Sequence, residues 1–278
     1  MKNRKTFFLT VFIWMMLLVF LPLPLSVVKC EGGYGTVEIR DHGPEAAAEE
    51  VGAEEYKPFI PDDLEKTVFG KDDSITVSNP ASYPFSAIAY MEVTGKCGCD
   101  WTASGYMVGT DKMLTAAHCL FCTEHWEQAE KIIFYFGYKN RRNYMYKYAG
   151  GWQARAGNDF SNHEYSPDMD YACIRLEKKI GEKVGCFGIL WDLSDSEISS
   201  QRLYIAGYRD GRLAYDSGRA KVKDTQHIIY RMDTVPGTSG GLIYTGDYYA
   251  IGINIAESEQ HNIGYRLGSE VREDLDGI

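Results

Sequence analysis

The sequence has little proline and no excess of basic residues. Only 9 of its 278 residues are proline and 28 are glycine, which excludes a collagenous or other low-complexity protein. Asp and Glu number 39 against 29 Lys and Arg, giving a net charge of −10 at pH 7. Proteins that wrap nucleic acid need a dense basic surface, so we expect no nucleic-acid partner. The hydrophobic content of 45% also excludes disorder along the whole chain.

Long apolar runs are absent except at the amino terminus. There, lysines and an arginine precede Phe7–Leu21, a stretch that is apolar apart from a single threonine. This order is typical of a secretory signal, and we assign residues 1–30 to it, with cleavage before Glu31. The alternative is a retained membrane anchor, because the run is nearly long enough to cross a bilayer. Pro22 and Pro24 would break the far end of such a helix, which favours removal.

Residues 31–66 form an acidic segment, with eleven Asp and Glu against three Lys and Arg. The segment is rich in Gly, Ala and Glu and lacks a period that would bury one face of a strand or helix. We therefore predict a flexible acidic leader and interpret it as a propeptide. The alternative is a solvated linker with no role.

From Thr67 onward the sequence changes to short runs rich in Tyr, Ile, Val and Phe. Gly, Asn and Asp interrupt these runs at close intervals, and helical periodicity is absent apart from Glu270–Leu275. The pattern predicts an all-β sandwich or barrel with a short C-terminal helix. Residues 67–278 are enough chain for one domain or two small packed ones.

The sequence contains seven cysteines, and an even six remain if Cys30 leaves with the signal sequence. The six are Cys97, Cys99, Cys119, Cys122, Cys173 and Cys186. A secreted chain would oxidise them, so we expect disulfides, although the sequence does not reveal their pairing. A competing interpretation is a zinc site made of Cys97-x-Cys99 and Cys119-x-x-Cys122, which an oxidising compartment disfavours. Cys173 alternates with apolar neighbours and is equally suited to be a buried free thiol.

A histidine and two aspartates have the positions expected of a general base and its orienting acid. His118 follows a run of small residues at the end of an expected strand, and such a packed place would keep its ring in one orientation. Asp168 and Asp170 stand at the mouth of another strand, where a carboxylate would be fixed in place. Each residue alone also has an ordinary structural explanation as a core histidine or a turn residue.

A serine flanked by glycines lies much further along the chain. In Gly237–Gly241 the glycines let the backbone bend sharply around Ser239 and leave room for a substrate carbonyl. The amides of Gly237 and Ser239 would then point at one spot as an oxyanion hole. The order His, Asp, Ser inside a β-rich secreted chain favours a catalytic triad over three unrelated structural residues.

Other functional classes compete with this interpretation. Gly-x-Ser-x-Gly also fits the nucleophile elbow of α/β hydrolases, but that fold needs an acid and a histidine after the serine. His261 is the sole histidine after Ser239, and the remaining chain is too short to build that fold. An inactive protease homologue acting as a binding module is the main alternative, and a structural surface protein is another.

At these residues the sequence resembles the chymotrypsin-like serine proteases, specifically the bacterial glutamyl endopeptidase (staphylococcal V8-like) group. The likeness covers nearly all of residues 67–278 and includes Val68–Asp73, Tyr83-Pro84 and Asp233-Thr234. The resemblance implies two antiparallel six-stranded β-barrels with the site in the cleft between them. His118 and Asp170 would come from the first barrel and Ser239 from the second.

The resemblance also implies a role for each residue of the site. It makes His118 the general base, Asp170 rather than Asp168 the orienting acid, and Ser239 the nucleophile. The amides of Gly237 and Ser239 become the oxyanion donors.

Substrate-binding residues follow from the same resemblance, with departures. Thr234 matches the threonine at the base of the group's pocket, and Arg266 is a candidate cation for an acidic side chain. Asn254 stands where glutamyl-specific members carry a histidine, so strict cleavage after glutamate is not expected. Asp233 stands where trypsin-like specificity needs an acid, but the group carries an aspartate there too, so this position does not establish basic specificity.

Together these features predict a secreted, extracellular serine endopeptidase that works through an acyl-enzyme and needs no cofactor or metal. The expected partners are protein or peptide substrates, with no stable membrane partner and a monomeric chain. We also expect a zymogen that is cut near Lys66-Thr67, where the acidic leader ends and the resemblance begins.

Overall fold

The computed structural model describes residues 33–39, 57–58, 69, 72–258 and 260–278 of the chain. The predicted signal sequence and the predicted cut at Lys66-Thr67 lie outside these residues. Within the described ranges, no helix combines the length and the apolar character needed to cross a membrane.

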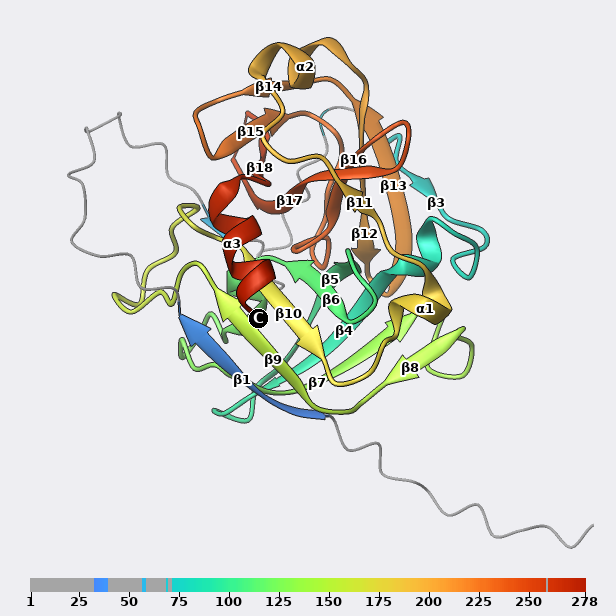
Figure 1. Cartoon of the computed structure of the whole chain (residues 1–278), viewed down its shortest axis with the longest axis vertical. Coiled ribbons are helices and arrows are strands. Elements are labelled where there is room, and N and C mark those ends of the chain that lie inside the picture. Colours follow the sequence, from blue (N-terminus) through green and yellow to red (C-terminus); the bar gives the residue numbers. More distant parts are fainter. Residues whose placement is uncertain (1–32, 40–56, 59–68, 70–71, 259) are drawn as a thin grey trace, which may run out of the picture. The chain divides into compact units, whose positions relative to one another are not determined.

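The first of two curled sheets holds eight strands (Figure 1). They are β1 (Gly33–Ile39), β4 (Ile88–Gly95), β5 (Asp100–Met107), β6 (Lys112–Thr115), β7 (Ala129–Phe136), β8 (Tyr146–Tyr148), β9 (Trp152–Ala156) and β10 (Ala172–Leu176). Their order is β1-β9-β10-β6-β5-β4-β7-β8. Strand β1 also pairs with β7, so it links two distant strands of the sheet and closes it.

The second sheet holds ten strands, mostly from the C-terminal half of the chain. They are β2 (Lys57–Pro58), β3 (Ile75–Thr76), β11 (Gly188–Ile189), β12 (Leu203–Arg209), β13 (Arg212–Gly218), β14 (Ala220–Val222), β15 (His227–Tyr230), β16 (Leu242–Thr245), β17 (Tyr249–Glu257) and β18 (Asn262–Arg266). The main path runs β14-β15-β18-β17-β16-β12-β13-β3, while β2 and β11 pair with β17. Antiparallel pairing dominates both sheets, and the all-β prediction is confirmed.

Side-chain alternation explains how the strands form the core. In β4, Met91 and Val93 are buried while Tyr90 and Glu92, which alternate with them, are partly exposed, the period of two expected of a strand with one face inward. Strand β17 is instead buried along nearly its whole length, which is typical of a central strand covered on both faces. One apolar cluster contains residues of both sheets, and a second, smaller cluster lies in the second sheet.

Short helices occupy the connections between strands. They are η1 (Phe85–Ala87), η2 (Ala117–Leu120), α1 (Gly181–Val184), α2 (Asp195–Ser200) and α3 (Ser269–Gly277). Helix α3 confirms the predicted C-terminal helix and packs against the first sheet. Tyr171 donates a hydrogen bond to Asp274 at 2.7 Å, and Lys112 donates to the carbonyl of Leu275 at 2.5 Å.

The prediction of a leader without regular structure is wrong for two segments. Strand β1 (Gly33–Ile39) runs parallel to β9 from Gly35 to Ile39, and β2 pairs with the end of β17. An ion pair of 3.3 Å joins Glu38 of β1 to Arg155 of β9. These pairings add one strand to each sheet, and the sheets of eight and ten strands exceed the expected six even without them. The acidic composition of the whole leader hid Thr36–Ile39, a run in which β-branched residues favour a strand.

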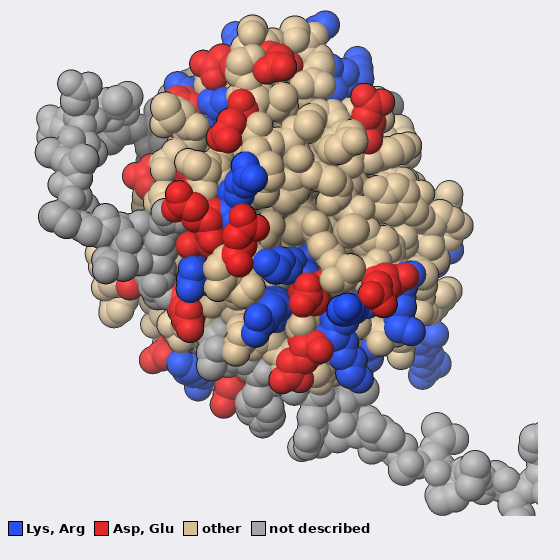
Figure 2. Space-filling view, in the orientation of Figure 1, with Lys and Arg blue, Asp and Glu red and all other residues tan. Residues whose placement is uncertain are grey.

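Charges of both signs are interspersed on the face shown in Figure 2. Lys and Arg lie among Asp and Glu there rather than in one continuous basic area. Much of the upper part of this face carries neither sign.

Candidate active site

His118 lies in η2, directly after strand β6, with its side chain 5% exposed. Its ring Nδ1 lies 2.8 Å from Asp170 Oδ2, and its backbone N–H donates to Asp170 Oδ1 at 2.9 Å. One carboxylate therefore fixes both the backbone and the ring of the histidine. Nδ1–H is the donor in this arrangement, which leaves Nε2 as the nitrogen able to accept a proton.

Asp170 is fully buried just before β10 and accepts a third hydrogen bond, from the hydroxyl of Tyr165 at 2.8 Å. Burial and the negative charge of Asp170 raise the pKa of Tyr165 well above 10, so the phenol stays protonated as a donor. No sequence pattern predicts this role for Tyr165, because nothing in its neighbourhood marks a tyrosine five residues before an aspartate. Asp168 is exposed, and its backbone carbonyl accepts from Asn158.

Opposing effects set the pKa of His118. Burial is the largest and would lower the pKa, but the charge and hydrogen bond of Asp170, together with those of Cys119, outweigh burial and hold the pKa of His118 well above 6.5. Such a histidine is a strong base when neutral, and any rate that needs it neutral rises with pH through that elevated pKa.

Ser239 lies on a glycine-rich loop before β16 that is anchored to β5 of the first sheet. The hydroxyl of Ser104 donates to the carbonyl of Gly237 at 2.8 Å, and the backbone N–H of Ser104 donates to the carbonyl of Ser239 at 2.9 Å. Gly240 has φ of +74°, and a Cβ there would collide with the Ser104 carbonyl oxygen and the Thr115 hydroxyl. Glycine is thus required for the loop to reach the first sheet.

The hydroxyl of Ser239 is buried and makes no hydrogen bond to a described residue. Ser239 is 4% exposed, and its Oγ has no hydrogen-bond partner in the part of the chain that the structure describes. Gly237 has φ of +93°, which turns the chain just before the serine. The amide of Thr238 donates to the Val235 carbonyl, whereas the amides of Gly237 and Ser239 donate to no described residue. Two amides that flank one residue and have no other described acceptor are what an oxyanion hole needs.

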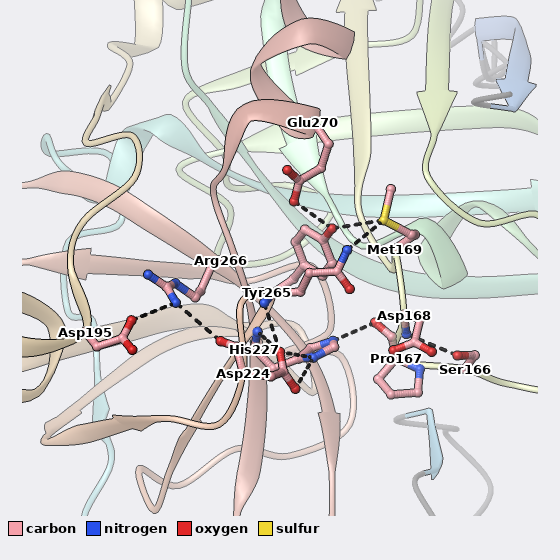
Figure 3. Close-up of polar contacts among 11 residues, drawn as sticks. Ser166, Pro167, Asp168, Met169, Asp195, Asp224, His227, Tyr265, Arg266 and Glu270 are labelled. Carbon is pink, nitrogen blue, oxygen red and sulfur yellow. Dashed lines mark hydrogen bonds and ion pairs between the residues drawn. The ribbon is translucent and has the colours of Figure 1, made fainter. Parts of the chain in front are cut away.

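The predicted pocket residues have different surroundings. Thr234 is 1% exposed, and its Oγ1 has no hydrogen-bond partner among the described residues. Asn254 is buried in β17, and its Oδ1 accepts from the hydroxyl of Tyr230 at 2.5 Å. Arg266 is committed elsewhere, since its guanidinium lies 3.1 Å from Asp195 (Figure 3). The guanidinium also donates to the carbonyl of Leu193 at 2.6 Å.

The second sheet holds the segment just before Asp170 in place. His227 at the start of β15 directs Nδ1 at Asp224 and Nε2 at the carbonyl of Pro167, 3.1 Å away (Figure 3). Burial opposes protonation of His227, but the hydrogen bond and charge of Asp224 outweigh it and raise its pKa above 6.5. Tyr265 of β18 adds a contact of 3.2 Å to the sulfur of Met169.

Asp233, six residues before the serine, receives the start of the predicted mature domain. Its two carboxylate oxygens accept the backbone N–H groups of Phe69 at 2.9 Å and Asp73 at 3.1 Å. The carboxylate is therefore engaged by backbone donors.

The expected disulfides do not form among the described residues, where none of the six cysteines is bonded to another. Cys119 is buried, with its sulfur 3.7 Å from Nε2 of His118. It is not grouped with the other cysteines of the predicted four-thiolate cluster. Cys97, Cys99 and Cys122 instead gather around His125, which the sequence analysis did not single out. The spacing Cys122-x-x-His125, beside Cys97-x-Cys99, was the available signal.

Comparisons with other proteins find similarity to known proteases. No family model matches it. It is 29% identical over 191 residues to the glutamyl endopeptidase of Bacillus licheniformis, an alignment that covers 64% of this chain and 55% of that protein. The chain thus spans about half the length of that relative.

Solved structures share the fold at lower identity. A Glu endopeptidase matches with a TM-score of 0.62 and 22% identity, over 76% of this chain and 98% of that one. The protease Anisep from Arthrobacter nicotinovorans matches with a TM-score of 0.54 and 19% identity, over 71% and 97%. The predicted resemblance to the glutamyl endopeptidase group and the predicted fold class are confirmed.

Proposed function

We propose that this chain is a serine endopeptidase that hydrolyses peptide bonds through His118, Asp170 and Ser239. The observation that carries the proposal is the buried His118–Asp170 pair of 2.8 Å, in a fold shared with proteases. The loop that carries the glycine-flanked Ser239 is hydrogen-bonded to Ser104 of the same sheet, which supports the proposal. The 29% identity to a glutamyl endopeptidase supports the same activity.

In the proposed reaction, Ser239 Oγ attacks the substrate carbonyl carbon while Nε2 of His118 takes the hydroxyl proton. The amides of Gly237 and Ser239 bind the oxyanion. His118 then gives its proton to the leaving amine as the C–N bond breaks, leaving an acyl-enzyme. Water, deprotonated by His118, hydrolyses the ester and restores the serine. Asp170 keeps the proton on Nδ1 throughout and stabilises the imidazolium.

A fluorophosphonate probe tests the proposal, because it phosphonylates only a serine that a neighbouring base activates. We expect one adduct per chain, mapped to Ser239 by mass spectrometry and absent from Ser239→Ala. The unbonded Oγ does not argue against reactivity, since catalytic hydrogen bonds often tighten only when substrate binds. An intact chain that never reacts with the probe would identify an inactive homologue that acts as a binding module.

The proposed substrates are proteins or peptides, with at most a modest preference for an acidic residue before the cleaved bond. Thr234 offers a buried, unpartnered hydroxyl. Asn254 supplies a neutral amide, whose hydrogen bond to a carboxylate is weaker by about half than a charge-assisted one. Arg266 is held by Asp195. A peptide-library profile tests this: strict cleavage after Glu would contradict it, and strict cleavage after Lys or Arg would implicate Asp233.

We further propose that residues 1–30 direct secretion and that the chain acts as a monomer on the outside of the cell. The same proposal makes residues 31–66 a propeptide and 67–278 the protease domain, with no stable membrane partner and no nucleic acid bound. The order of charged and apolar residues at the amino terminus supports secretion.

Processing near Lys66-Thr67 is expected to yield the active form. Asp233 accepts the N–H groups of Phe69 and Asp73, so a new amino terminus would begin close to the serine loop. Its positive charge would favour an acidic substrate side chain. Intact-mass and amino-terminal analysis of the secreted protein should place the terminus at Thr67 or Val68. A fully active enzyme that begins at Glu31 would contradict the prediction.

The charge of the new terminus can be tested separately. A mature form extended by one residue should lose activity on acidic substrates more than on neutral ones. Equal activity of the extended and the normal form would contradict the role given to the new amine.

Because β1 and β2 pair with both sheets, the cut leader should stay bound until these strands separate, which size-exclusion chromatography measures.

Tyr165→Phe is expected to lower kcat/KM for a peptide substrate about 10-fold, the scale of one hydrogen bond to a charged group. Without the phenol donor, the charge of Asp170 is less neutralised and raises the pKa of His118 further. The acidic limb of the pH profile should therefore move to higher pH. Tyr148→Phe, which removes a hydroxyl bonded to the carbonyl of Gly151, is the control and should leave the limb unmoved. If the acidic limb of the pH profile does not move in Tyr165→Phe, the tyrosine contributes to packing and does not affect the pKa of His118.

A further inference from the structure

Three thiols and one imidazole converge behind the helix that carries His118. Cys97 and Cys99 lie in the turn between β4 and β5, while Cys122 and His125 lie in the loop that follows η2. One ligand atom from each of the four residues lies within 4.8 Å of the other three. Nδ1 of His125 is 3.5 Å from the sulfur of Cys99 and 3.5 Å from that of Cys122.

These distances fit a tetrahedral metal ion. Zinc bonds of about 2.3 Å to sulfur and about 2.05 Å to nitrogen put two sulfurs about 3.8 Å apart, and a sulfur and a nitrogen about 3.6 Å apart. The two sulfur–nitrogen distances of 3.5 Å lie close to that value. Three cysteines and one histidine are also a common ligand set of structural zinc.

The backbone is arranged to bring the four donors together. Gly98, with φ of +84°, lets the chain reverse between Cys97 and Cys99. In the other loop, the amide of Cys122 donates to the carbonyl of Glu127 at 2.8 Å. The amide of Trp126 donates to the carbonyl of Cys122 at 2.5 Å.

A disulfide explains the cluster less well. Three thiols cannot all pair within the cluster, so a disulfide would leave one of them over. It would also give no reason for the imidazole nitrogen to be equally distant from two sulfurs. Zinc engages all four donors.

We propose that Cys97, Cys99, Cys122 and His125 bind one Zn²⁺ as a structural site. The four protein ligands leave no open position, which is typical of a structural rather than a catalytic ion. Binding releases the three thiol protons, because the sulfurs coordinate as thiolates, and neutral His125 binds through Nδ1. The carboxylate of Glu124 lies 3.9 Å from the other ring nitrogen, Nε2.

The ion would fasten the β4–β5 turn to the loop after His118. A few contacts already join these segments: the amide of Lys96 donates to the carbonyl of Gln128 at 2.9 Å, and Nε1 of Trp101 donates to that of Cys119 at 2.9 Å. Cys122 is only four residues from His118. Metal binding should therefore stabilise the segment that positions His118 without entering the chemistry.

Metal binding by the full chain tests the proposal independently of any peptidase activity. The protein is stripped with a chelator and a thiol reductant under anaerobic conditions and titrated with Co²⁺, then with Zn²⁺. We expect one Co²⁺ per chain, with thiolate charge-transfer bands and the visible bands of a tetrahedral site, all removed by one equivalent of Zn²⁺. Zinc should also raise the melting temperature by about 5 °C or more.

Variants assign the ligands. Cys97→Ser, Cys122→Ser and His125→Asn should each weaken Co²⁺ binding by more than about 100-fold, beyond the loss expected for an outer-shell residue. Cys186→Ser and His163→Asn remove an exposed thiol and an exposed imidazole outside the cluster and should bind like the wild type. Circular dichroism of each metal-free variant identifies any that fails to fold.

Two results would overturn the site. One is a folded wild-type chain that binds less than one Co²⁺ or shows no thiolate bands. The other is a disulfide that involves Cys97, Cys99 or Cys122 in the secreted protein, found by peptide mapping without reductant. Neither result bears on the proposed peptidase, which fluorophosphonate labelling tests separately.

Discussion

Replacing Ser239 with alanine is expected to reduce turnover of a peptide substrate by about 10³-fold or more while leaving the fold intact. The Oγ removed is the only atom of that side chain able to form the acyl-enzyme. It makes no hydrogen bond to any described residue, so its loss breaks no structural contact. Steady-state kinetics measures the loss, and thermal unfolding should give a melting temperature within a few degrees of the wild type.

His118→Ala should cause a comparable loss, because base and nucleophile act as one unit. For the same reason the double variant should be scarcely slower than either single variant, since removing the second member of a broken unit costs little more. If the two losses instead multiplied, the residues would be acting independently. Wild-type turnover by a folded Ser239→Ala protein would remove the assignment altogether.

Local patterns in the sequence account for most of the fold. The alternation in β4 and the nine-residue helix α3 are both carried by neighbouring residues, and both were predictable. Strand β1 was not, because its pairing with β9 and β7 depends on residues about a hundred or more positions away. A short strand in an acidic leader has no local signal strong enough to outweigh the composition around it.

The candidate site divides along the same line. His118 and Ser239 stand in short motifs whose glycines and small residues have a local meaning. Tyr165 acts through space, by a hydrogen bond that no spacing encodes. The role of Arg266 was predicted from a resemblance, but an ion pair with Asp195, 71 positions earlier, commits its side chain elsewhere. The two cysteine pairs in the sequence predicted part of the cluster of Cys97, Cys99, Cys122 and His125. That His125 rather than Cys119 is the fourth member follows only from the folded loops.

Asp170→Asn is expected to lower kcat for a peptide substrate by about 10⁴-fold at neutral pH. Asp170 accepts three hydrogen bonds, from the backbone and ring of His118 and from Tyr165. An amide puts an NH₂ donor where one of these acceptors stood. If that donor faces the ring, Nδ1 must become the acceptor, and the proton moves to Nε2, the nitrogen that has to receive the serine proton.

The pH dependence of the residual activity separates this effect from simple unfolding. Asp170 holds the pKa of His118 above 6.5 against the opposing effect of burial, so removing the charge should lower that pKa. A base with a lower pKa is neutral at lower pH, and the acidic limb of the rate profile should therefore move down, the opposite direction from Tyr165→Phe. Asp168→Asn is the matched control two residues away. Its side chain is exposed and the carboxylate of Asp170 already occupies Nδ1 of His118, so rate and limb should both stay at wild-type values. A larger loss in Asp168→Asn than in Asp170→Asn would mean that the buried carboxylate beside His118 serves the fold and that the orienting acid is Asp168.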